Sequence, residues 1–142
     1  MTIDPTLTAV YRRTDYLVFA DCGEFVLHID EYNPLFANFL KTQQADRFAL
    51  ISACNPRSVR HPDDANQLRH QNFCQLMQTN GCLFFPALGR SPDQSWQEQS
   101  LLLLNLSRET ALKWGRYLEQ NAILYGENNA IPTLLFCQKV EQ

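Results

Sequence analysis

The sequence of 142 residues lacks long apolar runs and clusters of basic residues. Its longest aliphatic block, Leu101 to Leu104, ends at Asn105, whereas a transmembrane helix needs roughly 20 apolar residues. Lys and Arg total 12 against 15 Asp and Glu, for a net charge of -3, and they form no patch that could neutralise several nucleic-acid phosphates. We therefore expect a protein that binds neither nucleic acid nor membrane.

Motifs for common metals and cofactors are also missing. There is no C-x-x-C pair and no H-E-x-x-H, and the spacing of His61 and His70 does not place them on one helical face. The five glycines are dispersed, so neither a Walker-type nor a dinucleotide-binding glycine pattern occurs. The sequence thus predicts no metal and no cofactor.

Cysteine usage and the first residues indicate a cytoplasmic protein. Arg12 and Arg13 follow the few apolar residues near the N-terminus, which is the wrong order for a secretory signal. The cysteines are odd in number and scattered, as reduced core thiols are. They are Cys22, Cys54, Cys74, Cys82 and Cys137.

The composition fits one ordered domain. Hydrophobic residues make up 45% of the chain and charged residues 19%, which is enough apolar material for a core and too little charge for disorder. We expect a single domain over residues 1–142 with an ordered core from about residue 15 to 138, disorder being confined to the ends.

Apolar periodicity predicts the order of helices and strands. A β-hairpin is expected over 16–20 and 25–29, followed by a helix that Asn33 caps and Pro34 begins. The remaining predicted elements are a buried central strand at 48–54, a helix at 62–79, strands at 82–88 and 101–106, a helix at 107–120, and strands at 122–125 and 132–137. From residue 47 onward this order is that of a ferredoxin-like split β-α-β core (βαββαβ), so we predict an α+β fold in which the N-terminal hairpin and helix extend that core.

Alternating element directions in such a fold bring several polar segments to one edge of the sheet. Polar groups that face inward there must find partners. One interpretation is structural: the asparagines close turns and caps while Glu98 pairs with Arg57 or Arg69. The other is a pocket that binds an anion through Arg57 and Ser58, with Trp96 as an apolar wall. The candidate ligand-binding residues are Asn55, Arg57, Ser58, Asn66, Arg69, Trp96, Glu98, Gln120 and Asn121.

Two nucleophile hypotheses are weaker. Ser58 or Ser100 could act with His61 or His70, but no nucleophile elbow surrounds either serine. Cys54 lies near Arg57, which could lower the pKa of a thiol, yet a buried inert thiol is the commoner case.

Four short motifs carry a resemblance to a known family. An apolar strand ends in Asn-Pro-x-Ser at Ser58, Asn66 follows downstream, Trp96 begins a Trp-x-Glu before a strand, and Gln120 begins a late Gln-Asn-Ala. Together, over residues 30 to 138, they make the chain similar to the bacterial domain-of-unknown-function family numbered 3293. The resemblance implies membership and implies no reaction, cofactor or partner.

Two functional hypotheses from different classes follow. The favoured one is a non-enzymatic interaction or regulatory module that meets itself or another protein through a strand edge or an apolar patch, because no catalytic arrangement is complete. The alternative is a binding protein or an enzyme that holds an anionic metabolite at the polar end of the sheet. In an enzyme, Glu98 would be available as acid or base.

Overall fold

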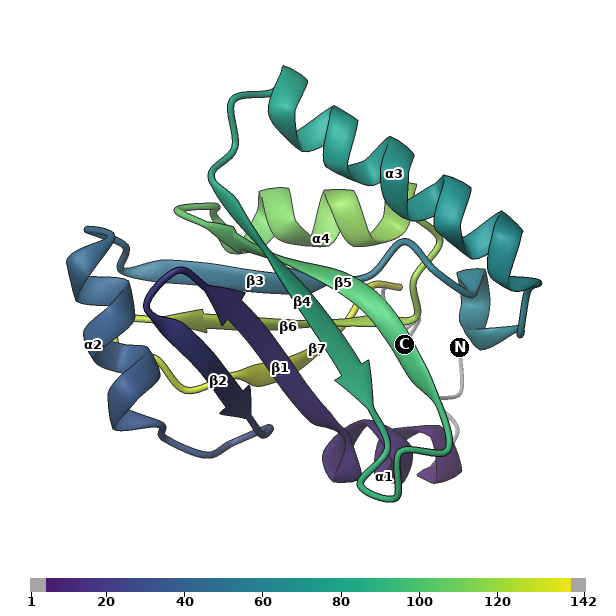
Figure 1. Ribbon diagram of the computed structural model, residues 1–142, viewed down its shortest axis with the longest axis horizontal. Coiled ribbons are helices and arrows are strands. Elements are labelled where there is room, and N and C mark those ends of the chain that lie inside the picture. The colour runs from purple at the N-terminus through teal and green to yellow at the C-terminus, as the bar shows by residue number, and fades with distance from the viewer. Residues whose placement is uncertain (1–4, 139–142) are drawn as a thin grey trace.

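The computed structural model describes residues 5–138, which form an α+β fold of four α-helices and one curled, seven-stranded antiparallel sheet (Figure 1). The strand order in the sheet is β2-β1-β4-β5-β3-β6-β7. The helices are α1 (Pro5–Arg13), α2 (Pro34–Thr42), α3 (Asp63–Thr79) and α4 (Arg108–Tyr117), with a short 3-10 turn at Pro56–Ser58. The strands are β1 (Asp15–Ala20), β2 (Gly23–Leu27), β3 (Arg47–Ile51), β4 (Phe84–Arg90), β5 (Gln97–Leu104), β6 (Ala122–Glu127) and β7 (Thr133–Phe136).

Local sequence signals account for most of these elements. The Asn33 side chain accepts hydrogen bonds from the backbone N–H groups of Leu35 and Phe36, which caps α2 as expected. Ser107 caps α4 by accepting from the N–H of Thr110. The predicted hairpin is present as β1 and β2, and α3 ends just before Asn80, as the sequence indicates.

The main element that the sequence analysis did not predict is helix α1. It lies before residue 15, where the ordered core was expected to begin, and it starts at Pro5. No residue of α1 is fully buried, so its apolar signal is weak and the helix depends on contacts with the sheet. The expectation of disorder at the chain ends covers the residues before 15 and after 138; of these, residues 1–4 and 139–142 lie outside the described residues.

Strand β3 is buried on both faces of the sheet, as its continuous apolar sequence predicts. Along β3, Phe48 and Leu50 belong to one apolar cluster, whereas Ala49 and Ile51 belong to another. Helices α3 and α4 cover the second cluster together and lie on one side of the sheet in Figure 1. Helix α2 fills part of the opposite, inner face, and Tyr11 of α1 packs on the same cluster.

The cysteines are only partly where the sequence places them. All five are free, and Cys54 and Cys137 are buried as expected. Cys22 is exposed instead, because it lies in the turn between β1 and β2 and not within a packed strand. Among the described helices, none combines the length and the apolarity that crossing a membrane requires.

Helix α4 packs closely on the sheet at Gly115, where there is no room for a larger side chain. A Cβ at this position would lie 2.6 Å from Cys137 Sγ and 2.9 Å from Ile123 Cγ2. In an exposed helix, Gly→Ala stabilises by about 1 kcal/mol. Here we expect Gly115→Ala to lower the free energy of unfolding by about 1–3 kcal/mol through overpacking. Urea denaturation measures this, with the exposed Lys113→Ala as control. A more stable Gly115→Ala variant would show that the helix is not tightly packed.

Candidate functional site

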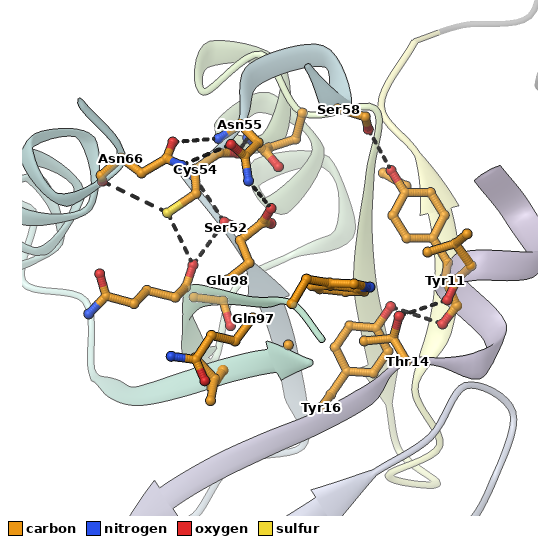
Figure 2. A pocket seen from close by; sticks show the side chains of 18 of the residues that line it. Tyr11, Thr14, Tyr16, Ser52, Cys54, Asn55, Ser58, Asn66, Gln97 and Glu98 are labelled. Atoms are coloured by element: carbon orange, nitrogen blue, oxygen red, sulfur yellow. Dashed lines mark hydrogen bonds between the residues drawn. The ribbon is translucent and has the colours of Figure 1, made fainter. Parts of the chain in front are cut away.

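A cavity of about 860 Å³ opens at one end of the inner face of the sheet. Its walls come from α1, the start of α3, and strands β1, β3, β4, β5, β6 and β7. Figure 2 shows its polar side chains in two groups, with Asn55, Asn66 and Glu98 in one and Tyr11, Thr14 and Tyr16 in the other. The volume lies within the range typical of small-molecule sites, about 300–1,000 Å³.

The cavity arises because the inner face of the sheet changes character along its strands. On β5 the alternating inner positions are Leu102 and then Ser100 and Glu98, so large apolar side chains give way to a small and a charged one. On β3 the same alternation runs from Leu50 to Ser52 just beyond the strand end. Helix α2 packs on the apolar half of this face and leaves the other half uncovered.

Helix α1 covers this open half. Leu7, Val10 and Tyr11 line the cavity at helical spacing. The Tyr11 hydroxyl lies 3.4 Å from Ser58 Oγ across the site, and Arg12 forms an ion pair of 2.7 Å with Asp30. These contacts tie the helix to two loops from different parts of the chain.

Asn55 organises the polar wall of the cavity and uses its whole amide group. Its Nδ2 donates to Glu98 Oε2 at 2.9 Å, and its Oδ1 accepts from Asn66 Nδ2 at 2.8 Å and from the His61 N–H at 2.9 Å. Its backbone N–H donates to Asn66 Oδ1 at 2.8 Å. Glu98 is therefore held at a defined position by a side chain that is itself fixed.

A second set of hydrogen bonds fastens the loop that carries Asn55 to the loop between α4 and β6. Arg69 donates to the carbonyl oxygens of Ala53 (2.7 Å) and Leu118 (3.0 Å). Gln120 Nε2 donates to the carbonyl oxygens of Cys54 (3.0 Å) and Leu118 (3.2 Å). Asn121 Nδ2 donates to Ser58 Oγ at 2.9 Å. This scaffold holds the polar wall in place.

The loop carries backbone strain that this scaffold sustains. Asn55, Arg57 and Ser58 have positive φ angles of 47°, 57° and 62°. Asparagine tolerates this region, but Arg and Ser adopt it at a cost of order 1–3 kcal/mol each. The Arg57 N–H donates to the Glu119 carbonyl at 2.7 Å, one of the contacts that hold the strained turn.

Burial shifts the protonation of the groups around the cavity. Burial raises the pKa of Glu98, and the hydrogen bond from Asn55 opposes this shift only in part. Burial also raises the pKa of Tyr11 and of Tyr16, and the negative charge of Glu98 adds to both shifts. Both phenols therefore stay protonated at neutral pH, and Glu98 holds its proton more tightly than an exposed glutamate.

Ser100 is the one lining residue among those described whose buried polar atom has no hydrogen-bond partner. Its side chain lies in the inner face of β5 and only 3% of the residue is exposed. Its Oγ makes no hydrogen bond within the described residues. A buried hydroxyl normally has a partner, so this atom is available to a molecule in the cavity.

The structure brings most of the nine predicted site residues to the cavity wall. Asn55, Ser58, Asn66, Trp96, Glu98 and Gln120 line it, and Trp96 is 40% exposed at its rim.

Arg57, Arg69 and Asn121 do not line the cavity. The Arg57 side chain is 63% exposed, and its Nε lies 3.6 Å from Glu119 Oε2. Arg69 donates its hydrogen bonds to backbone carbonyl oxygens. The expected pairing of Glu98 with Arg57 or Arg69 is wrong, because the amide of Asn55 takes that place.

The sequence analysis missed the opposite wall, formed by Tyr11, Thr14 and Tyr16. Leu7, Val10 and Tyr11 recur at the spacing of a helix, and Pro5 suits a first helical position. This signal spans two turns only, so it was not distinguishable from an irregular N-terminal segment.

The nucleophile hypotheses find no geometric support in residues 5–138. Ser58 Oγ contacts Tyr11 and Asn121, Ser100 Oγ has no partner, and neither serine bonds a histidine. Burial and the nearby Glu98 carboxylate raise the pKa of Cys54, which makes it a less reactive thiol. No group of three potential metal-binding side chains occurs within the same residues.

Comparison with known proteins gives one result. A family model described as "Protein of unknown function (DUF3293)" matches residues 51–123. This segment runs from the end of β3 to the start of β6 and contains Asn55, Asn66, Glu98 and Ser100. No curated protein matches the chain, and no solved structure does.

The raised pKa of Glu98 predicts a pH-dependent stability. The folded protein binds this proton more tightly than the unfolded chain, so the contribution is full below the ordinary glutamate pKa and is lost as the pH rises through the raised folded-state pKa. Glu98→Gln mimics the protonated form, so we expect the wild type to lose stability relative to this variant as the pH rises from the ordinary glutamate pKa towards and past the raised one. Urea denaturation across that range measures the difference. Gln97→Asn, a neutral change on the same strand, is the control, and a pH-independent difference for Glu98→Gln would contradict the interpretation.

Proposed function

Since the chain belongs to the DUF3293 family, whose description names no function, we propose from its geometry that the protein binds a small molecule in the cavity beneath α1. The observation that carries the proposal is the convergence of Glu98 and Ser100 on an open volume of about 860 Å³. Sites of this kind combine apolar walls with a few well-positioned polar groups. Here Leu50, Leu124 and Leu134 are among the apolar lining residues.

Three features support a role beyond packing. The Ser100 hydroxyl is buried without a partner, the strained turn at Arg57 and Ser58 borders the site, and the pKa of Glu98 is raised. Strain, unpaired polar atoms and shifted carboxyl groups gather at functional sites more often than elsewhere.

Glu98 is the group best suited to chemistry. A carboxyl group with a raised pKa donates a proton and takes it back at a higher pH than an exposed glutamate, and the Asn55 amide orients its Oε2. We therefore propose that any reaction in this cavity uses Glu98 as its acid or base. The tyrosine hydroxyls of the opposite wall stay protonated and serve as hydrogen-bonding groups.

We further propose that β3, α3, β4, β5, α4 and β6 form a ferredoxin-like core. Support comes from the order β4-β5-β3-β6, in which all neighbours are antiparallel, and from the position of both helices on one face. The free cysteines support a reducing compartment such as the cytoplasm.

An interaction module is the second candidate, and the surface around β2 favours it. Strand β2 is an edge of the sheet, and Leu35 (72% exposed) and Tyr32 (59% exposed) lie with Val26 beside a shallow groove. Analytical ultracentrifugation tests whether this surface mediates self-association. Association that Leu35→Ser abolishes would support the interaction module, and a monomer at high concentration would count against self-association.

The cavity hypothesis is tested by ligand-induced stabilisation. Against a panel of small metabolites, we expect some members to raise the melting temperature of the wild type. Glu98→Gln should remove or reduce that rise, whereas Arg57→Ala should keep it, because Arg57 lies outside the cavity lining. A panel that leaves the melting temperature unchanged would weigh against a binding cavity.

Ser100→Ala separates a structural hydroxyl from one that serves a ligand. Because Ser100 Oγ has no partner, its removal should leave the free energy of unfolding unchanged or raise it by up to about 1 kcal/mol. The same variant should bind the panel ligands more weakly. Urea denaturation and calorimetry measure the two effects, and a loss of stability would show that the hydroxyl has a structural partner.

A further inference from the structure

The charges that line the cavity are distributed unevenly. Among the described residues that line it, the charged or readily protonated side chains are Glu98, Arg60, His61 and Asp63. Arg60 and Asp63 are exposed, opposite in charge, and lie at the entrance to α3 with the partly buried His61. Among the residues that the strands contribute, Glu98 alone carries a charge. A buried anion would therefore meet a carboxyl group without a compensating cation.

The nearby arginines do not change this balance. Arg69 donates to the carbonyl oxygens of Ala53 and Leu118, and Arg57 lies beside Glu119. Arg90, at the end of β4, is outside the lining. These positions argue against the anionic metabolite that the sequence alone suggests.

Several hydrogen-bond donors on the cavity wall already bind acceptors of the protein itself. The Tyr16 hydroxyl donates to the Tyr11 carbonyl at 3.1 Å, and the Thr14 hydroxyl donates to the Val10 carbonyl at 2.7 Å. Ser52 Oγ donates to the Gln99 carbonyl at 2.8 Å, and Gln120 donates through Nε2 to two carbonyl oxygens. Each of these side chains keeps an oxygen that can only accept further hydrogen bonds.

These side chains thus add acceptor oxygens to the wall of the cavity that carries Glu98. A ligand that matches this wall must supply several donors, and an ammonium group supplies three together with a positive charge. Aromatic rings of Tyr11, Tyr16 and Trp96 also line the cavity, and aromatic rings attract cations. The aliphatic lining residues suit an apolar body attached to the cation.

We propose that the cavity takes an organic cation, a protonated amine on an apolar body, whose ammonium group lies between Glu98 and the acceptor oxygens of Ser100, Thr14 and Tyr16. This inference rests on the proposed small-molecule function and names the ligand class for the same cavity.

Three probes that share an indole body but differ in charge test the inference. Tryptamine is a cation, tryptophol is neutral and indole-3-acetate is an anion at pH 7. We expect calorimetry to give tryptamine a Kd at least about tenfold lower than those of the other two. Glu98→Gln should weaken tryptamine binding by about tenfold and change tryptophol binding by less than about twofold. Arg57→Ala is the matched control and should leave the order of the three probes unchanged.

The pH dependence gives a second readout. Because a bound cation favours ionised Glu98, tryptamine affinity should rise with pH through the titration of Glu98, and Glu98→Gln should abolish that rise. The titratable and charged groups near Glu98 are Arg60, His61 and Asp63 of the lining, Tyr11 and Tyr16 of the opposite wall, and Cys54 behind it. The comparison with Glu98→Gln isolates Glu98 from all of them.

Failure of this inference differs from failure of the proposed function. Tightest binding of indole-3-acetate, equal binding of all three probes, or an equal effect of Glu98→Gln on all of them would overturn the cation while leaving a ligand cavity. The cation inference also fails, and the ligand cavity remains, if none of the three probes binds but metabolites from the panel shift the backbone amide resonances of Tyr11 and Ser100. If neither probes nor panel members shift those resonances, the proposed function fails as well.

Discussion

The candidate site depends on a single constraint: the inner face of the sheet has large apolar side chains over only part of its length. On β5, Leu104 and Leu102 pack beneath α2, and the next two inner positions are Ser100 and Glu98. A sheet face that is covered must be filled, and side chains of this size do not fill it. The covering helix α1 therefore spans a cavity, and α1 itself has no fully buried residue.

Much of the polar cluster at this end of the sheet is scaffold. Arg69, Gln120 and Asn121 spend their donors on the loop that carries Asn55 and Ser58. Three of the four residues from Asn55 to Ser58 have positive φ angles, and such strain persists only where surrounding contacts over-determine it. The structural interpretation therefore applies to Arg69, Gln120 and Asn121, which fix the loop. The functional interpretation applies to Glu98 and Ser100, which line the cavity.

This division also alters the chemistry expected of the site. The arginines that suggested an anion belong to the scaffold or to the surface, and Glu98 is the one charged group that the strands contribute to the cavity wall. Its raised pKa lets it switch between donor and acceptor at a higher pH than an exposed glutamate does, and the hydroxyl oxygens of Thr14 and Tyr16 are acceptors because their protons are already engaged. Both proposed roles of this wall, binding a cation and transferring a proton, therefore depend on Glu98.

Local signals in the sequence were sufficient for most elements. Asn33 with Pro34 marks the start of α2, Asn80 marks the end of α3, and the apolar run from Phe48 onward marks a strand buried on both faces, because caps and periodicity act over a few residues. The direction of successive elements also placed Asn55, Asn66, Glu98 and Gln120 at one end of the sheet.

Tertiary structure alone decided which of these side chains face the cavity. Whether Arg69 meets a carboxylate or two backbone carbonyls depends on loops that lie far apart in the sequence, and the short helix α1 is positioned by its contacts with the sheet. The sequence by itself determined the elements and the end of the sheet at which polar groups collect, since these follow from local propensity and strand direction. Only the fold decided that Tyr11, Thr14 and Tyr16 close the opposite wall and that Ser100 is left without a partner, because long-range packing is what pairs or isolates a buried polar group.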